Sequence, residues 1–227
     1  MKRILIFLIL CLPLRAAVVT IEADDCNVGQ SMHDYGDVKL WRATYMHEDV
    51  NLVLAHCYDA ICAVESSHPD LPLGNNVIGD CSPISGHLED YWYSNGPFLF
   101  LEIHGFAKKL TVSSVSKPGT INKVLVVKFF DANGVTVAYM FDTRTTLVID
   151  MGDYKAVYGF IYPGAVRSID HIVIDYQPIP PPDFATFIDY WLCECSIPNL
   201  WCEGSDVNHD MIVNFMDYAR LFLEGCP

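Results

Sequence analysis

Residues that offer side-chain or backbone oxygens alternate along a twelve-residue segment near the end of the chain. They are Asp206, Asn208, Asp210, Ile212 through its carbonyl, Asn214 and Asp217. Their spacing matches positions 1, 3, 5, 7, 9 and 12 of a calcium-binding loop, in which successive oxygens converge on one cation. We therefore predict that this segment binds Ca²⁺. The alternative is a polar surface loop that only opens a helix, with Asn214 as its N-cap.

Two residues of this loop depart from the common pattern. Position 6 requires a positive φ and is usually Gly, but here it is Met211, for which a left-handed backbone costs about 1–2 kcal/mol. Position 12 is Asp217, whose side chain is shorter than the usual Glu. We expect a weak site, which the millimolar calcium found outside cells would still fill.

The elements that would position this loop form a short repeat. Residues 183–192 align with residues 214–223 at an offset of 31, and in both segments apolar residues recur at spacings of 3, 4, 7 and 8. This spacing predicts two amphipathic helices that pack face to face. Carrying the loop pattern back by 31 residues places Gln177, Ile179 and Thr186 at ligand positions, so we expect the first loop to bind no metal.

The segment 183–227 resembles a dockerin type I module. Such an EF-hand-like module has a pair of D-x-N-x-D-G-x-[IV]-[ND]-x-x-D calcium loops, each followed by a helix. The six ligand positions of the second loop match this motif, whereas Met211 does not. The resemblance implies a helical calcium module that docks onto a cohesin-like or other extracellular protein partner, or otherwise tethers an exported protein. It also implies a polysaccharide-related setting, because dockerins are common in such systems.

The beginning of the chain predicts export. Met1-Lys2-Arg3 precedes a short apolar run at residues 4–12, and the small residues Ala16 and Ala17 follow. This pattern is typical of a secretory signal peptide, which we place at residues 1–17. We therefore expect a protein that is secreted, either extracellular or held at the cell surface.

Eight of the nine cysteines would remain in the exported chain: Cys26, Cys57, Cys62 and Cys81 in its first part, and Cys193, Cys195, Cys202 and Cys226 near its end. Even numbers in an exported protein favour disulfides within each group, with the pairing left open. A zinc site is the disfavoured alternative, because Cys193-Glu-Cys195 lacks the usual C-x₂-C spacing. The C-terminal segment is too short for a large core, so we expect disulfides and calcium to stabilise it.

The chain is strongly acidic, with a formal net charge of −14. Loss of the three basic residues Lys2, Arg3 and Arg15 with the signal peptide would make it −17. We expect no nucleic-acid partner, because phosphate binding requires a basic surface. We also expect no membrane insertion, because no later segment is long and apolar enough.

The large unit has short runs rich in Val, Ile, Phe and Tyr, separated by turn residues. These runs predict strands at residues 18–22, 38–45, 98–106, 110–115, 123–130, 135–141, 147–151, 156–161 and 169–176. Asp131-Ala-Asn-Gly134 predicts a hairpin turn, and residues 51–64 are a weak helical candidate. The expected fold is mainly β: a β-sandwich or jelly roll, followed by the small α-helical, EF-hand-like calcium module.

Residues 177–182, Gln-Pro-Ile-Pro-Pro-Pro, predict a short, stiff linker. The β-sandwich domain before it would span residues 18–176, and the dockerin-like domain after it would span residues 183–227. Residues 19–25, 129–134 and 168–176 loosely resemble stretches of β-sandwich domains in exported bacterial proteins with surface-anchoring tails. That resemblance implies a lectin-like architecture and no particular activity.

We find no familiar catalytic constellation in the sequence, and we predict that the protein is not an enzyme. His47-Glu-Asp-Val-Asn51 begins like a zinc-binding H-E-x-x-H helix, but Asn51 replaces the second histidine. A G-x-S-x-G nucleophile motif is also missing from the sequence. A polysaccharide hydrolase with an unrecognised site is one alternative.

Three aromatic residues, Trp41, Tyr91 and Tyr93, are candidates for glycan binding, because aromatic faces stack on sugar rings. In a strand, alternation would send Tyr91 and Tyr93 to one face and Trp92 to the other, and we expect Trp92 in the core. The leading hypothesis is a secreted, non-catalytic binding or display protein whose calcium-binding tail mediates docking or tethering. A carbohydrate-binding, lectin-like module is the other alternative.

Overall fold

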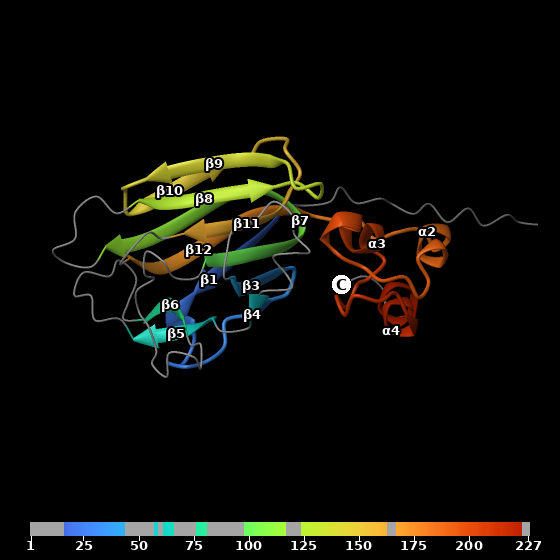
Figure 1. Cartoon of the computed structure of the whole chain (residues 1–227). Helices are drawn as coiled ribbons and strands as arrows, with labels where there is room; N and C mark the ends of the chain where they lie inside the picture. Colours follow the sequence, from blue (N-terminus) through green and yellow to red (C-terminus); the bar gives the residue numbers. More distant parts are fainter. Residues whose placement is uncertain are drawn as a thin grey trace, which may run out of the picture.

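The computed structural model describes residues 16–43, 57–58, 61–65, 76–80, 98–116, 124–162 and 167–223. Within these ranges the protein is mainly β, and its α-helices gather at the C-terminal end (Figure 1). The strands are β1 (Ala17–Glu22), β2 (Asp34–Tyr35), β3 (Val38–Ala43), β4 (Cys57–Tyr58), β5 (Ile61–Glu65), β6 (Asn76–Asp80), β7 (Phe98–Ser116), β8 (Leu125–Phe130), β9 (Thr136–Asp142), β10 (Thr146–Asp150), β11 (Ala156–Tyr162) and β12 (Arg167–Pro178). The helical segments are η1 (Ala23–Asp25), α2 (Phe184–Asp189), η2 (Ile197–Asn199), α3 (Leu200–Gly204), α4 (Phe215–Tyr218) and the π-helical η3 (Ala219–Leu223).

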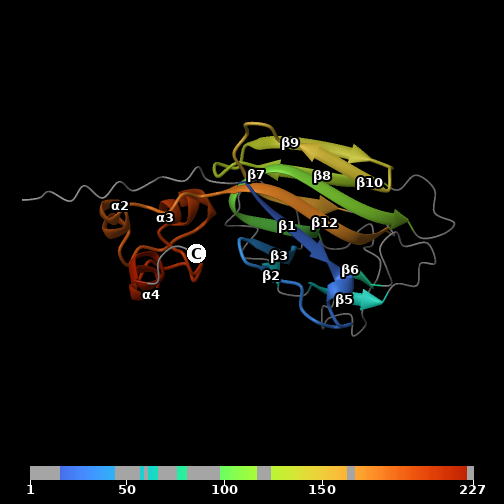
Figure 2. The same ribbon diagram turned by 180° about the vertical axis from the view of Figure 1, so that it is seen from behind.

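The described strands join in one large antiparallel sheet around the long strand β7 (Figures 1 and 2). The main strand order is β5-β6-β12-β7-β11-β8-β9, and β1 pairs with β12. The first part of β7 pairs with β3 and β11, and its second part pairs with β10 and β12. This 19-residue strand therefore connects two groups of strands into a single sheet.

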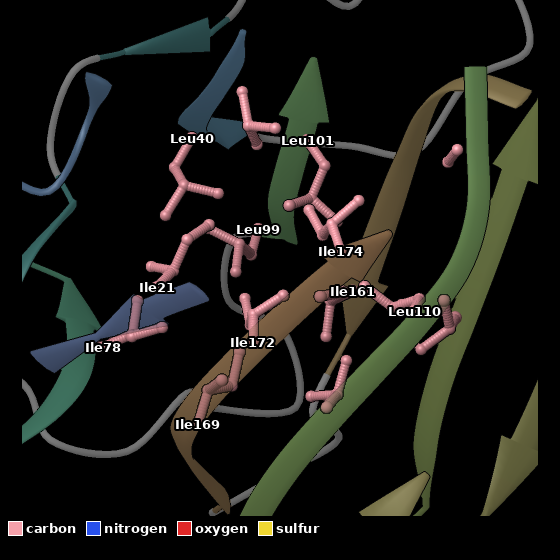
Figure 3. Close-up of a cluster of buried hydrophobic side chains, with 14 of the residues drawn as sticks. Ile21, Leu40, Ile78, Leu99, Leu101, Leu110, Ile161, Ile169, Ile172 and Ile174 are labelled. Carbon is pink, nitrogen blue, oxygen red and sulfur yellow. The ribbon is translucent and has the colours of Figure 1, made fainter. Parts of the chain in front are cut away.

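The main core lies where these two groups of strands face each other. Side chains alternate along each strand, so Leu99 and Leu101 of β7 meet Ile172 and Ile174 of β12 in one cluster (Figure 3). Ile21 of β1 joins them, and all five side chains are fully buried. Burial of such aliphatic groups stabilises the fold by about 25 cal/mol for each Å² of apolar surface.

A second cluster, made largely of aromatic residues, lies on the other side of β7, β8 and β11. Phe100, Phe130, Tyr158 and Phe160 are fully buried there, and Phe130 stacks on Tyr158 with ring centroids 5.0 Å apart. Trp201 from the C-terminal segment packs into the same cluster. The tail, which we define as residues 183–223, is therefore in direct contact with the sheet.

The hairpin turn predicted at residues 131–134 is confirmed. Gly134 donates its N–H to the carbonyl of Asp131 at 3.1 Å and has a φ of 80°. Asp131 Oδ1 accepts the backbone N–H groups of Asn133 and Val135, both at 2.9 Å. The Asp131 carboxylate thus fixes the turn between β8 and β9.

Several boundaries differ from those predicted. Residues 98–106 and 110–115 form one strand, because Ala107 continues the pairing with both β11 and β12. The weak helical prediction at residues 51–64 is wrong where the structure describes it, since β5 begins at Ile61. Strand β12 continues to Pro178, the second residue of the expected linker.

The tail contains the two predicted helices, α2 and α4. Asp183 caps α2 by accepting the N–H of Thr186 at 2.8 Å, and Asn214 caps α4 by accepting that of Met216 at 2.7 Å. Phe187 and Tyr218, which are equivalent in the repeat, pack with ring centroids 6.1 Å apart. These contacts hold the two helices together around a small core.

Candidate metal centre

The loop that precedes α4 pairs with the segment that follows α2. Cys195 donates its N–H to the carbonyl of Met211, and Leu192 donates to the carbonyl of Val213, each at 2.8 Å. An isolated antiparallel bridge joins Glu194 and Ile212 between these bonds. This pairing fixes the second half of the loop, including the carbonyl at position 7.

Three carboxylates of the loop converge. Asp206, Asp210 and Asp217 each offer one oxygen, and these oxygens all lie within 4.8 Å of one another. Asp206 is 1% exposed and Asp217 is 0% exposed, whereas Asp210 lies at the surface. Burial raises the pKa of Asp206 above its ordinary value, and the negative charges of Asp217 and Asp210 raise it further. Like charges this close repel one another unless a cation or a proton compensates them.

Backbone N–H groups orient the buried carboxylate of Asp217. Its Oδ1 accepts the N–H groups of Val207 and Asn208 at 2.9 and 3.0 Å, and its Oδ2 accepts that of Asn214 at 2.9 Å. A carboxylate has about four lone-pair sites, so these three bonds leave room for a metal ligand bond. The sequence positions Asp217 for this role by placing it three residues after the N-cap of α4.

The backbone at Met211 has the left-handed conformation that its loop position requires, with a φ of 73°. This conformation directs its N–H to Asp206 Oδ2 at 2.9 Å, while the N–H of Asp210 reaches Asp206 Oδ1 at 3.1 Å. The expected positive φ at position 6 is therefore confirmed in a residue other than Gly. The strain of this backbone conformation destabilises the loop by about 1–2 kcal/mol.

The two asparagines of the loop direct their amide groups at Asp210. Asn208 Nδ2 and Asn214 Nδ2 donate to Asp210 Oδ2 at 3.0 and 3.2 Å, and Asn214 Nδ2 also donates to the carbonyl of Ile212 at 3.0 Å. These N–H groups donate to Asp210 Oδ2 and to the Ile212 carbonyl, which are also proposed ligands of a cation. Asn214 is the N-cap of α4 as well, so the helix-opening role that we considered as the alternative is present beside the acidic cluster.

This donor set fits a hard divalent cation. It consists of oxygens, three of them from carboxylates, and Ca²⁺ prefers such ligands in a flexible geometry. Of the six ligands predicted from the sequence, the structure brings the carboxylates of Asp206, Asp210 and Asp217 together. The metal-binding role of Asn208, Ile212 and Asn214 stays a prediction. A bound ion would supply the positive charge that the three clustered carboxylates lack.

The cysteines follow the prediction only in part. Cys195 and Cys202 form a disulfide within the tail, and Cys62 of β5 is disulfide-bonded as well. In the described structure Cys26 and Cys193 are free, so the prediction of a disulfide is wrong for these two residues. Side chains alternate between the two faces of this extended segment, so Cys193 faces solvent while Cys195 points into the tail core. The side chains of Cys57, Cys81 and Cys226 lie outside the described residues.

The tail contacts the sheet through residues that the sequence analysis did not single out. Trp201 of α3 is 3% exposed and donates its Nε1–H to Glu102 Oε1 of β7 at 3.2 Å. His104 stacks on the Trp201 indole with ring centroids 4.1 Å apart, and its Nε2 lies 3.0 Å from the same Glu102 oxygen. Trp41 of β3 donates to Glu102 Oε2 at 3.0 Å. One buried carboxylate therefore bonds to both the sheet and the tail.

This environment determines two charge states. Burial alone would raise the pKa of Glu102, but the hydrogen bonds from His104 and Trp41 and the positive charge of Lys39 lower it below its ordinary value. The pKa of His209 is lowered to about 3, first by burial and then by His104 and Lys39. At neutral pH Glu102 is therefore ionised and His209 is neutral. Glu102 and His104 are the two polar side chains within the otherwise apolar first part of β7, residues 98–107. This pattern marks a special position in the strand but does not identify Trp201 as its partner.

The predicted glycan-binding residues are placed only in part. Trp41 is half-buried, with its indole N–H bonded to Glu102 and its ring 4.1 Å from that of His33. Its polar edge is thus directed into the sheet–tail contact. Tyr91 and Tyr93 lie outside the described residues, as does Trp92. Two other aromatic residues, Tyr139 and Phe141 of β9, are exposed, with ring centroids 6.2 Å apart.

An apolar groove lies between α2 and α4. It has a volume of about 560 Å³ and is lined by Phe184, Phe187, Ile188, Trp191, Phe215 and Tyr218. Phe184 and Phe215, which are equivalent in the repeat, are 55% and 62% exposed. The two helices therefore do not cover each other's apolar faces as predicted. They meet through Phe187 and Tyr218 and leave the rim of the groove open to solvent.

The helices of the described residues are all too short or too polar to cross a membrane. No protein-family model matches the chain, and no curated protein matches it. Among solved structures, the K2 cleaved adhesin domain of Lys-gingipain is similar at 11% identity and a TM-score of 0.36, over 70% of this chain and 97% of that one. This likeness is too remote to support an inference about function, which must come from the chain's own residues.

Proposed function

We propose that this is an exported, non-catalytic binding or display protein, whose calcium-binding tail docks it onto another extracellular protein. The observation that carries the proposal is the convergence of three carboxylates in the loop of residues 206–217. The Cys195–Cys202 disulfide supports it, because disulfides persist in oxidising, extracellular compartments. The architecture we propose is a β-sandwich or jelly-roll domain followed by a dockerin-like helical module.

Calcium would stabilise the tail electrostatically. Neutralising the carboxylates of Asp206, Asp210 and Asp217 removes their mutual repulsion and fixes the start of α4. At millimolar free calcium and a Kd of about 10⁻⁴–10⁻³ M, the bound form gains about 0.4–1.4 kcal/mol. A unit of about 45 residues has a small core, so a gain of this size matters for its stability.

The groove between α2 and α4 is the surface that we propose for docking to a cohesin-like or other extracellular protein. Its rim exposes the large apolar side chains of Phe184, Ile188, Trp191 and Phe215. Contiguous apolar surface of this kind is typical of protein interaction sites. Because α4 starts within the calcium loop, a cation that fixes the loop also fixes one wall of the groove.

Calcium-dependent capture of a specific partner tests this proposal. Immobilised full-length protein is exposed to the exported proteins of its source organism, in millimolar calcium or in EGTA. We expect one defined protein to be retained in calcium and released by EGTA. A variant that carries both Phe184→Ser and Phe215→Ser should not retain this protein. Tyr139→Ser, which alters an exposed aromatic residue of β9, is the matched control. Retention that ignores both EGTA and the groove variants would count against the proposal.

Carbohydrate binding by the sheet is the second candidate function, and the exposed pair Tyr139 and Phe141 favours it. Rings on one face of a strand offer a flat apolar surface on which a sugar ring stacks. A glycan array probed with the full-length protein tests this function. We expect signals that disappear in Tyr139→Ala and Phe141→Ala, and an array without any signal would remove this candidate.

A further inference from the structure

The calcium loop also forms part of the contact between the tail and the sheet. His209, at position 4 of the loop, places its ring against that of His104 of β7, with centroids 3.6 Å apart. The carbonyl of His209 accepts a hydrogen bond from Lys39 Nζ of β3 at 3.4 Å. Two residues of the sheet therefore touch a residue that lies between two of the proposed ligands, Asn208 and Asp210.

A second set of contacts connects the loop to Trp201. The N–H of Asp206, the first ligand position, donates to the carbonyl of Trp201 at 3.3 Å. The neighbouring Cys202 is bonded to Cys195, whose N–H donates to the carbonyl of Met211 in the loop. The loop is thus bonded to Trp201 directly at its first residue, and its middle is connected through the disulfide to Cys202, the neighbour of Trp201. A change in loop conformation would be transmitted to the position of Trp201.

Charge makes this contact sensitive to a cation. A hollow of about 360 Å³ lies between the loop and the sheet, lined by Asp34, Gly36, Asp37, Lys39, Val207, Asn208, His209 and Arg220. Two acidic residues, Asp34 and Asp37, and two basic residues, Lys39 and Arg220, line it together, and charges separated by less than about 8 Å are only partly screened at physiological salt. A divalent cation would reduce the three negative charges of the loop cluster to one. The balance of charge across the contact would change accordingly.

We propose that calcium in the loop of residues 206–217 latches the tail onto the sheet through His209 and Trp201. This inference rests on the calcium site proposed above. The coupling is reciprocal, because a ligand that favours the docked state must bind more tightly when docking is favoured. Sheet residues that offer no oxygen to the ion therefore raise its affinity for the protein.

The test is the calcium Kd of the full-length protein, measured by isothermal titration calorimetry with CaCl₂ as the probe. His104→Ala removes the ring that contacts both Trp201 and His209, and Trp201→Phe removes the hydrogen bond to Glu102. Neither substitution alters a proposed ligand. We expect the Kd to rise by about fivefold or more in His104→Ala, the lower end of couplings between two sites, and by less in Trp201→Phe. The control Tyr154→Ser, at an exposed residue between β10 and β11, should bind calcium like the wild type.

The outcomes distinguish the latch from the calcium site. Calcium binding with the same Kd in the wild type and in both variants overturns the latch and leaves the site intact. A wild type that shows no binding overturns both. Should His104→Ala fail to fold, as judged by circular dichroism, Trp201→Phe and hydrogen exchange of the wild type decide the question. Calcium must then slow amide exchange in residues 34–41 of the sheet, and unchanged exchange there contradicts the latch.

Discussion

Replacing Asp217 by Asn changes one buried atom from oxygen to nitrogen with almost no change in shape. In the structure Oδ1 accepts two backbone N–H groups and Oδ2 accepts that of Asn214 at 2.9 Å. An amide keeps the first two bonds only by turning its NH₂ group towards the Asn214 N–H. That N–H then faces another donor, so its hydrogen bond is lost in a buried place.

The size of the effect follows from these contacts. A hydrogen bond to a charged group contributes about 1.5–3 kcal/mol, and a buried donor without a partner costs about 1–3 kcal/mol. We therefore expect opening of the loop to become easier by about 2 kcal/mol, which is about 30-fold in the equilibrium constant. The effect should be present without calcium, because these bonds involve no ion. Relief of the repulsion from Asp206 and Asp210 offsets part of the lost hydrogen bonding, and the expected value of about 2 kcal/mol is the net change.

Amide hydrogen exchange of the full-length protein measures this change locally. In EGTA the amides of Val207, Asn208 and Asn214 should exchange about 30-fold faster in Asp217→Asn than in the wild type. Asp210→Ala is the matched variant, because Asp210 is exposed and its carboxylate accepts one backbone N–H. In EGTA the loop amides of Asp210→Ala should exchange at nearly the wild-type rate. In calcium they should lack the slower exchange that the wild type shows. Wild-type exchange rates in Asp217→Asn would refute the reasoning.

Three further predictions concern backbone strain, pH and the disulfide. Met211→Gly should slow exchange of the Met211 amide in EGTA by about threefold or more, because Gly avoids the strain of a positive φ. Met216→Gly in α4 is the control, which should speed this exchange or leave it unchanged. The pKa of Glu102 is lower in the folded protein than its ordinary value of 4.5, so ionised Glu102 stabilises the fold at pH values above 4.5. This stabilisation is lost as the pH falls through the lowered pKa. Glu102→Gln should therefore show a smaller drop of the urea midpoint between about pH 6 and pH 3 than the wild type, and an equal drop would contradict the sign. Cys202→Ser opens a short disulfide loop and should destabilise the tail by about 2.5 kcal/mol, seen as faster exchange of the Val213 amide.

The acidic loop and the turn at residues 131–134 were predictable because each depends on contacts between near neighbours. The order of Asp and Asn residues determines which oxygens converge, and the position of Met211 in that order requires a positive φ whatever the side chain. Asn214 and Asp217 cap α4 through bonds that span two or three residues. Local sequence rules therefore describe this part of the structure well.

The contact between the tail and the sheet was not predictable in the same way. Glu102 and Trp201 are 99 residues apart, and nothing near either residue specifies the other. The periodicity of residues 183–192 and 214–223 correctly predicts apolar helix faces, but it does not determine how much of each face the other covers. Strand β7 continues through Ala107 because β11 and β12 pair with it there, which is again a tertiary effect.

Equilibrium dialysis of the purified full-length protein against Ca²⁺ tests the central claim most directly. The three converging carboxylates predict one bound ion per chain, with a Kd of about 10⁻⁴–10⁻³ M as in other extracellular modules, and no bound ion in Asp210→Ala. A wild-type protein that retains no more calcium than Asp210→Ala at millimolar concentrations would contradict the calcium site and the docking function that depends on it.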